Sequence, residues 1–109
     1  TGSTGYSLSC GGPILMPDTN NFIITPIASH NLNVRPLIIS DKNEVKLEVD
    51  KRFNHFKLSI DGKQLDLTNE HSIRVQKSQS FINLLIVKET DYLNTLRNKL
   101  LWGLDKRNN

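Results

Sequence analysis

The feature that most constrains the fold of this chain is an alternation of apolar and polar side chains through its middle. Residues 45–50 and 56–60 each place an apolar side chain at every second position, with charged or polar residues between them. A period of two puts neighbouring side chains on opposite faces of a strand, so both runs predict half-buried antiparallel strands. A chain built around such strands is mainly β.

A tight turn follows the second run. The dipeptide Asp61-Gly62 favours a type I′ turn and predicts a hairpin that returns through residues 64–67. Further strands are predicted at residues 22–28, 72–76 and 81–87, and residues 37–39 form a short apolar run. The first of these contains Pro26, which has no N–H to donate, so this strand is expected at an edge or broken at the proline.

Small and hydroxyl-bearing residues dominate the first part of the chain. Residues 1–13 predict a short helix that is capped by Ser3 or Thr4 and stopped at Gly11-Gly12-Pro13. This helix precedes the predicted strands.

Helical periodicity returns only at the other end of the sequence. Apolar residues from Tyr92 to as far as Leu104 fall on one face of a helix, and Asp91 stands where an N-cap belongs. The 109 residues suffice for one modest core. We therefore expect one mainly β domain, α+β overall: an antiparallel β-sandwich with a short N-terminal helix and a C-terminal helix.

Charge and composition exclude several classes of function. The chain carries 14 Lys and Arg against 11 Asp and Glu, and the two signs alternate between residues 41 and 57, which is typical of a solvated surface rather than a nucleic-acid interface. The single cysteine, Cys10, cannot form an intramolecular disulfide, so a cytoplasmic location is expected. No apolar run approaches the roughly 18 residues that span a bilayer, and neither a membrane association nor a signal peptide is expected.

The sequence contains no complete catalytic motif. The patterns Gly-x-Ser-x-Gly, Gly-x-x-x-x-Gly-Lys-Ser/Thr and Gly-x-Gly-x-x-Gly are all absent. His30, His55 and His71 lack the spacing of zinc ligands, so no metal site is expected. Cys10 is predicted to be a packed thiol rather than a nucleophile.

The predicted first helix is the segment whose residues are suited to bind a ligand. An entrance built from Gly, Ser and Thr presents free backbone N–H groups and hydroxyls, which suit a ribose, a pyrophosphate or an amide. Tyr6 lies among these small residues and can stack on a base. From the residues alone, a capped helix packed on a sheet is an equally good interpretation.

Four blocks of sequence carry a resemblance to bacterial NAD kinases. The block Thr-Gly-Ser-Thr-Gly-Tyr-Ser-Leu-Ser-Cys-Gly-Gly-Pro-Ile at residues 1–14 resembles the family's Thr-Gly-Ser-Thr-Ala-Tyr-Ser-Leu-Ser-Ala-Gly-Gly-Pro-Ile. Residues 25–37 resemble its Thr-Pro-Ile-x-x-His-x-Leu-x-x-Arg-Pro-Leu. Residues 59–62 are similar to its Asp-Gly turn, and residues 96–103 to its Leu-Arg-x-Lys-Leu-x-Trp segment.

The resemblance implies ATP-dependent phosphorylation of the 2′-hydroxyl of the adenosine ribose of NAD, which gives NADP. In that family an N-terminal α/β domain carries Gly-Gly-Asp-Gly-Thr, whose Asp acts on the hydroxyl, and an Asn-Glu pair holds the nucleoside. The Gly-Gly-Asp-Gly-Thr motif does not occur here. Residues 1–109 are therefore expected to be the C-terminal NAD-binding and oligomerisation domain, truncated on its N-terminal side. The domain would supply one wall of the NAD site and no catalytic residue.

Carried over to this sequence, the first block lines the dinucleotide. We expect backbone and hydroxyl contacts from Thr4 and Gly5, packing of Tyr6 against a nucleoside, and a polar contact from Ser9. Ser7 and Leu8 complete the matched lining. Gly5 stands where the family usually has Ala, so a methyl group is missing there.

Two more segments are implied to lie near the ligand. Ala28 corresponds to a position near the bound nucleotide, although it also fits as an ordinary small strand residue. Asp61 and Gly62 correspond to a turn near the NAD site, often across a subunit contact, and their simpler interpretation is a hairpin turn. Whether Lys63 or Gln64 contacts the ligand stays open.

Three further side chains of the matched blocks are expected to stabilise the fold rather than to contact the ligand. His30 and Arg35 are expected to hold the segment between two strands by hydrogen bonds, and Trp102 to pack the final helix.

The resemblance also implies partners: NAD as substrate, ATP or polyphosphate as donor, a divalent metal such as Mg²⁺ with ATP, and a homo-oligomer. A competing hypothesis is a non-enzymatic β-sandwich module for oligomerisation or interaction. A lipid-kinase relative is disfavoured by the closeness of the first block.

Overall fold

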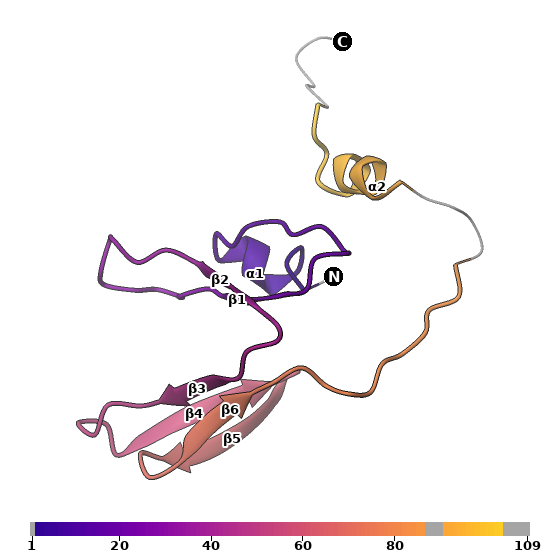
Figure 1. Cartoon of the computed structure of the whole chain (residues 1–109). Coiled ribbons are helices and arrows are strands. Elements are labelled where there is room, and N and C mark those ends of the chain that lie inside the picture. Colours follow the sequence, from indigo (N-terminus) through magenta and orange to yellow (C-terminus); the bar gives the residue numbers. More distant parts are fainter. Residues whose placement is uncertain (1, 87–90, 104–109) are drawn as a thin grey trace. The chain divides into compact units, whose positions relative to one another are not determined.

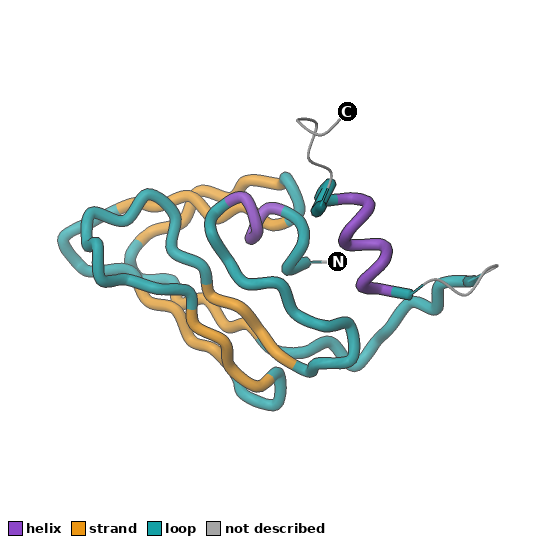
Figure 2. Tube along the Cα trace, turned by 90° about the horizontal axis from the view of Figure 1, so that it is seen from above, coloured by secondary structure: helices purple, strands orange, loops and turns teal. Residues whose placement is uncertain are grey.

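The computed structural model describes residues 2–86 and 91–103. The chain divides into two compact units, Thr1–Gln79 and Ser80–Asn109. Figure 1 labels the elements along the chain, and Figure 2 shows that strands and loops make up most of the first unit. The elements of the first unit are α1 (Tyr6–Ser9), β1 (Asn21–Ile24), β2 (Leu37–Ser40), β3 (Val45–Glu48), β4 (His55–Ile60), β5 (Lys63–Thr68) and β6 (Ser72–Val75). The second unit contains α2 (Tyr92–Lys99). The expected mainly β, α+β fold with two short helices is confirmed.

Three antiparallel two-stranded ribbons form the described sheets: β1 with β2, β3 with β6, and β4 with β5. In the first ribbon Phe22 stands opposite Ile39 and Ile23 opposite Ile38. Strand β1 ends at Ile24, two residues before Pro26, so the predicted break at the proline is confirmed.

The β4–β5 hairpin follows directly from its turn residues. Asp61 and Gly62 have φ of 47° and 81°, the positive values that a type I′ turn requires. They form a two-residue loop, because Ile60 pairs with Lys63. The turn predicted from Asp61-Gly62 is confirmed, and the hairpin lies within the chain between β3 and its partner β6.

Apolar side chains of two ribbons border a common cavity of about 550 Å³. Leu47 of β3 and Ile60 of β4 both line it, and they remain 43% and 54% exposed. A second pocket, of about 260 Å³, is lined by Phe22, Ile23, Ile24, Val45, Leu47 and Val75. Packed interiors leave few voids of this size, so the apolar faces of the ribbons are incompletely covered. Their packing into a closed sandwich stays a prediction.

The strand expected at residues 81–87 was wrong over its described part. Residues 81–86 adopt no regular secondary structure, and Ile82 and Leu85 are 88% and 91% exposed. Val87 lies outside the described residues. An apolar run becomes a strand only when a neighbouring strand supplies hydrogen bonds, and none pairs with residues 81–86 in the described structure.

The second unit confirms the predicted cap of the C-terminal helix. The side chain of Asp91 accepts a hydrogen bond of 3.1 Å from the backbone N–H of Leu93. Leu96 is buried, and Arg97 lies in the last turn, where a cation opposes the helix dipole favourably. The helix ends at Lys99 with Leu100 as its C-cap, and residues 101–103 form a turn, so the predicted extension of the helix was wrong over its described part. Leu104 lies outside the described residues.

The remaining features of this unit concern its exposure. Trp102, which was expected to pack the final helix, is 51% exposed. No helix in the described ranges is long and apolar enough to cross a membrane.

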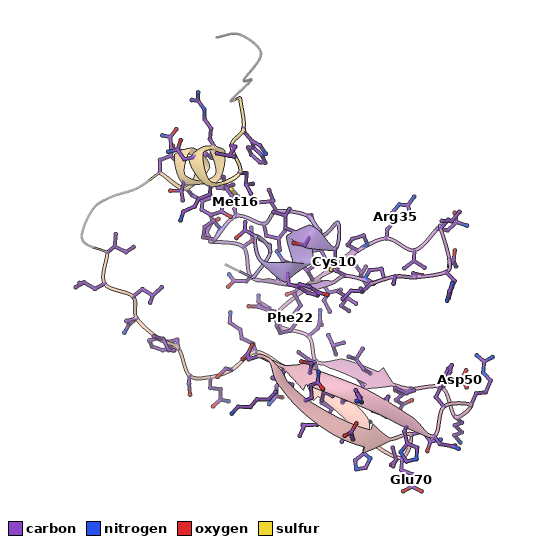
Figure 3. The ribbon with its side chains drawn as sticks, turned by 180° about the vertical axis from the view of Figure 1, so that it is seen from behind. Cys10, Met16, Phe22, Arg35, Asp50 and Glu70 are labelled. Atoms are coloured by element: carbon purple, nitrogen blue, oxygen red, sulfur yellow. The ribbon has the colours of Figure 1, made fainter. Side chains whose placement is uncertain are left out.

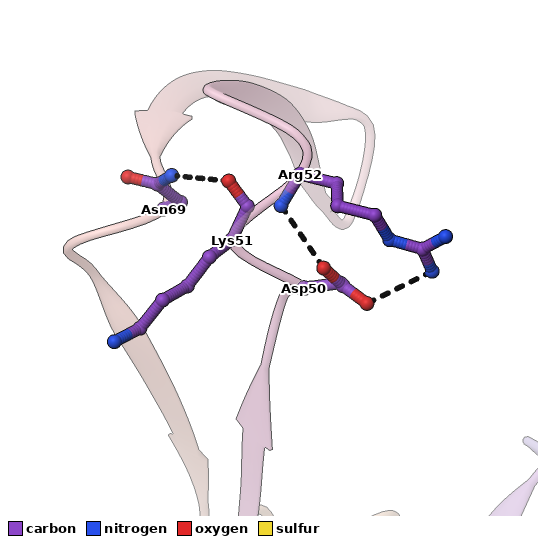
Figure 4. Close-up of polar contacts among 4 residues, drawn as sticks. All are labelled: Asp50, Lys51, Arg52 and Asn69. Carbon is purple, nitrogen blue, oxygen red and sulfur yellow. Dashed lines mark hydrogen bonds and ion pairs between the residues drawn. The ribbon is translucent and has the colours of Figure 1, made fainter.

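The loop between β3 and β4 is held by the polar contacts drawn in Figure 4. The Asp50 carboxylate accepts hydrogen bonds from the Arg52 backbone N–H and from its guanidinium, both at 2.9 Å. Asn69, which follows β5, donates its side-chain amide to the Lys51 carbonyl at 3.2 Å. Together these bonds join the β3–β4 loop to the β5–β6 turn.

The contacts of Asp50 generate a prediction about its titration. Hydrogen bonds from the Arg52 side chain and backbone lower the pKa of the Asp50 carboxyl below its ordinary value. Because the folded pKa lies below the unfolded one, the contribution to stability is present above about pH 4 and is lost as pH falls through the folded pKa. In Arg52→Ala we expect the pKa of Asp50 to rise toward its ordinary value, as measured by carboxyl ¹³C NMR titration.

Glu48 provides the control for that titration. Its pKa is also lowered, but by the hydrogen bond and charge of Lys46. Arg52→Ala should therefore leave the titration of Glu48 in place. An Asp50 pKa that does not move in the variant would show that Arg52 is not the cause.

Candidate functional site

Helix α1 is one turn long and is closed by two glycines. The Gly11 N–H donates to the Leu8 carbonyl at 3.0 Å, and the Gly12 N–H donates to the Ser7 carbonyl at 2.8 Å. With φ of +80° at Gly11, these two bonds form a Schellman motif. The stop predicted at Gly11-Gly12-Pro13 is confirmed.

The predicted N-cap of α1 was wrong. Gly5 occupies the cap position and makes no side-chain cap bond, rather than Ser3 or Thr4. The hydroxyl of Ser3 instead accepts a hydrogen bond of 3.1 Å from the backbone N–H of Leu15, twelve residues later. That longer-range bond ties the start of the chain to the segment after α1, and it explains why Ser3 does not cap the helix.

The side chains of α1 divide into an exposed pair and a half-buried pair. Tyr6 is 73% exposed and Ser9 is also exposed, whereas Ser7 and Leu8 are half-buried. The hydroxyls of Ser7 and Thr25 are 2.9 Å apart and share a hydrogen bond. Thr25 directly follows β1, so this bond joins the helix to the end of the first ribbon.

Gly12 makes the closest approach to this contact. The residue is buried, and a Cβ at position 12 would lie 2.2 Å from the Ser7 hydroxyl, 2.7 Å from the Ser7 carbonyl oxygen and 3.0 Å from the Thr25 hydroxyl. Real Cβ atoms do not approach other atoms so closely. Gly12 is therefore required by sterics rather than by its backbone angles.

The two neighbouring glycines yield a matched test. In Gly12→Ala the added methyl forces α1 away from Thr25, and we expect a loss of about 1–3 kcal/mol in the free energy of unfolding. In Gly11→Ala the methyl meets nothing within 4 Å, and only the left-handed φ of +80° is penalised, at about 1–2 kcal/mol.

Chemical denaturation and backbone NMR separate the two effects. Gly12→Ala should shift the resonances of Ser7 and Thr25, whereas Gly11→Ala should leave those of Thr25 in place. Unchanged Thr25 resonances in Gly12→Ala would refute the steric argument.

The segment between β1 and β2 contains the next predicted site residue. Ala28 is exposed and has φ of 50°, a left-handed value that is uncommon for a residue with a side chain. Close to it, the Ser29 hydroxyl accepts a hydrogen bond from the Asn31 backbone N–H at 3.2 Å. Ala28 lies three positions after Thr25, so the backbone turns soon after the contact with α1.

Arg35 holds the far part of the same segment, as Figure 3 shows. Its guanidinium donates to the backbone carbonyls of Leu32 at 2.6 Å and Val34 at 3.0 Å. The predicted hydrogen-bonding function of Arg35 is confirmed. The imidazole of His30, assigned the same function, is exposed and forms no hydrogen bond within the described residues.

The Asp61–Gly62 turn lies on a different ribbon from the one that α1 contacts. Both residues are exposed, as are Lys63 and Gln64 at the start of β5. Because consecutive strand residues point to opposite faces, Lys63 and Gln64 present their side chains on different sides of the ribbon. The structure thus brings Thr4–Ser9 into one continuous surface, and it does not join the turn to them through a shared sheet.

Titratable groups are sparse around α1. Cys10 is a free, half-buried cysteine, and Figure 3 shows it at α1. Among the described residues no group of three His, Cys, Asp or Glu side chains could hold a metal ion. The surface of α1 therefore offers hydroxyls, backbone groups and one aromatic ring, which can bind and orient a ligand.

Comparison with known proteins identifies the family. Residues 1–87 match the family model described as the ATP-NAD kinase C-terminal domain. The chain belongs to this family. The match includes α1, all six described strands and the Asp61–Gly62 turn, so it contains three of the four blocks, and the resemblance to the family is confirmed.

Individual relatives of this ATP-NAD kinase C-terminal domain agree. The chain is 53% identical over 108 residues to the NAD kinase of Flavobacterium psychrophilum, covering 99% of this chain and 37% of that protein. It is 51% identical over 108 residues to the NAD kinase of Christiangramia forsetii, with the same coverage. The NAD kinase of Chlorobium limicola is 45% identical over 104 residues, covering 94% of this chain and 36% of that protein. The chain thus spans little more than a third of the length of these curated relatives.

Thr25 contributes to this surface of the ATP-NAD kinase C-terminal domain, and its contribution was not predicted from the sequence. Thr25 was assigned to a strand, yet its hydroxyl contacts Ser7 and lies beside Gly12. A partial signal existed, since Thr25 opens the second block that resembles the family. Nothing in the spacing of the two blocks, however, predicts that these hydroxyls meet.

Proposed function

We propose that this chain is the part of an NAD kinase that supplies one wall of its NAD site. In the complete protein, a phosphoryl group is transferred from ATP to the 2′-hydroxyl of the adenosine ribose of NAD, which gives NADP. The proposal is supported by the match to the ATP-NAD kinase C-terminal domain and by relatives named NAD kinase.

A single structural observation carries the proposal: the ring of Tyr6 stands 73% exposed on α1 beside Gly5, which has no side chain. An aromatic side chain so exposed in a segment of small residues is available to stack on a nucleoside. Ser9 offers a hydroxyl on the exposed side of the helix. Thr4 and Gly5, which directly precede the ring, are proposed to contact the ligand.

The remaining residues of the site support this surface. Ser7 and Leu8 are half-buried and lie beneath the exposed surface of α1. Ala28, with its turned backbone, is proposed to approach the nucleotide. Asp61 and Gly62 are proposed to reach the NAD site from the hairpin, and they would do so from a second subunit of a homo-oligomer.

The chemistry proposed for this chain is binding and orientation. Holding the ribose in one orientation relative to the donor lowers the entropic part of the barrier to phosphoryl transfer. A divalent metal, proposed as Mg²⁺, would accompany ATP and neutralise charge on its phosphates. No group of three His, Cys, Asp or Glu side chains that could hold such an ion is found among the described residues, and none of its ligands is assigned to this chain. Polyphosphate as an alternative donor and a cytoplasmic location remain part of the proposal.

The first test of the proposal is the stacking by Tyr6. In Tyr6→Ala we expect KM for NAD to rise by roughly 5- to 150-fold, the loss of about 1–3 kcal/mol associated with one base stacked on an aromatic ring. Tyr6→Phe keeps the ring and should retain most of the affinity. Steady-state kinetics of the complete protein, with NAD varied at saturating ATP, measure the effect.

Phe53→Ala is the matched control for Tyr6→Ala. Phe53 is 58% exposed and lies in the β3–β4 loop, so removal of its ring should leave the NAD kinetics unchanged. Equal KM values for wild type and Tyr6→Ala would remove Tyr6 from the site.

The second test concerns the separate chain. The family's Gly-Gly-Asp-Gly-Thr motif does not occur in these 109 residues, so the Asp that acts on the hydroxyl is missing from them. We expect the chain on its own to produce no NADP from NAD and ATP in an enzymatic cycling assay. Production of NADP by the purified chain would contradict this division of labour.

A further inference from the structure

We propose that Thr25 is a positioning residue for NAD, acting through Ser7 to set the face that α1 presents to the ligand. This inference rests on the proposed function, because it assigns a cause to the orientation of Tyr6 and Ser9. Thr25 itself contacts Ser7 and is not offered as a ligand contact.

The geometry of the hydroxyl pair is the first support. The Ser7 and Thr25 hydroxyls are 2.9 Å apart in a part-buried position, and both residues are half-buried. The bond joins residues 18 positions apart. It is thus a tertiary contact between α1 and the end of β1, unlike the local backbone bonds that close the helix.

The helical repeat relates the directions of the other α1 side chains to the Ser7–Thr25 contact. Successive residues of an α-helix are rotated by about 100°. With Ser7 directed at Thr25, Ser9 is rotated by about 200° and points away from the strand. Ser7 is half-buried and Ser9 is exposed, as this rotation requires. Tyr6 and Leu8 lie about 100° to either side of Ser7, and of these two Tyr6 is the exposed one.

A helix of four residues needs such a contact because its own bonds cannot hold its orientation. The N-cap Gly5 makes no side-chain cap bond, and the helix contains no fully buried side chain. Gly12 leaves room for the hydroxyl pair, since a Cβ there would collide with the hydroxyl and carbonyl oxygen of Ser7 and lie in tight contact with the Thr25 hydroxyl. The rotation of α1 is therefore set at the Ser7–Thr25 contact.

Substitution of Thr25 tests the hydroxyl without changing the size of the side chain. Thr25→Val keeps the shape and removes the hydrogen bond, so we expect KM for NAD to rise about three- to tenfold, the scale set by one hydrogen bond. The value of kcat should stay within about twofold, because the reacting groups are not moved. Thr25→Ser restores the hydroxyl and should restore KM.

A double-mutant cycle separates positioning from direct contact. Ser7→Ala should raise KM for NAD as much as Thr25→Val does, and the double variant should show no further increase, because both changes remove the same bond. If the two increases multiply, the Ser7 hydroxyl meets the ligand independently and the inference is overturned.

Thr68→Val is the matched control. Thr68 also ends a strand, β5, and its hydroxyl lies 2.9 Å from Nδ1 of His71. Its removal should leave KM for NAD unchanged, and an equal increase there would attribute the effect of Thr25→Val to general loss of packing, which overturns the inference. Thermal unfolding of each variant establishes that it is folded, and Ser7→Ala with Thr25→Ser carry the test if Thr25→Val does not fold.

The complete protein distinguishes this inference from the function on which it rests. A wild-type protein that forms no NADP and binds no NAD would refute the proposed function, and the inference with it. A wild-type protein that forms NADP, with Thr25→Val retaining the wild-type KM, would refute the positioning by Thr25 alone.

Discussion

The missing side chain of Gly12 is the constraint on which the site depends. Its backbone lies against Ser7 and Thr25 in a space that no Cβ can enter, and its N–H closes α1 on the Ser7 carbonyl. One residue therefore ends the helix and seats it against the first ribbon. Ser9 lies on the side of the turn opposite this contact and is exposed, and Tyr6 is exposed beside it.

Local features of the fold could be predicted from the sequence, whereas features that need a partner could not. The Asp61–Gly62 turn, the end of β1 before Pro26 and the Asp91 cap depend on residues within a few positions of each other, and all three were predicted correctly. Ser3 was assigned as a cap because serine favours that position, but its hydroxyl is engaged by Leu15. The apolar run at residues 81–86 has the composition of a strand without the paired strand that would make it one.

The same division holds for the candidate site. The composition of residues 1–13 pointed to a ligand surface, and resemblance to the family supplied the residues that line it. Thr25 was missed because the meeting of two hydroxyls 18 positions apart is a tertiary event. Among the described residues no group of three His, Cys, Asp or Glu side chains could hold a metal ion, and the candidate surface consists of hydroxyls and one aromatic ring on α1.

The pairing of β3 with β6 has a consequence for the order in which the chain can fold. Val45 pairs with Val75 and Glu48 with Ser72, and the entire β4–β5 hairpin lies between them. Closing a long flexible loop costs more conformational entropy than closing a short one. Once the Asp61–Gly62 turn has formed the hairpin, the free chain that must close to bring β3 to β6 is reduced to the segments on either side of it. A two-residue turn thereby lowers the entropic barrier to a ribbon in which it takes no part.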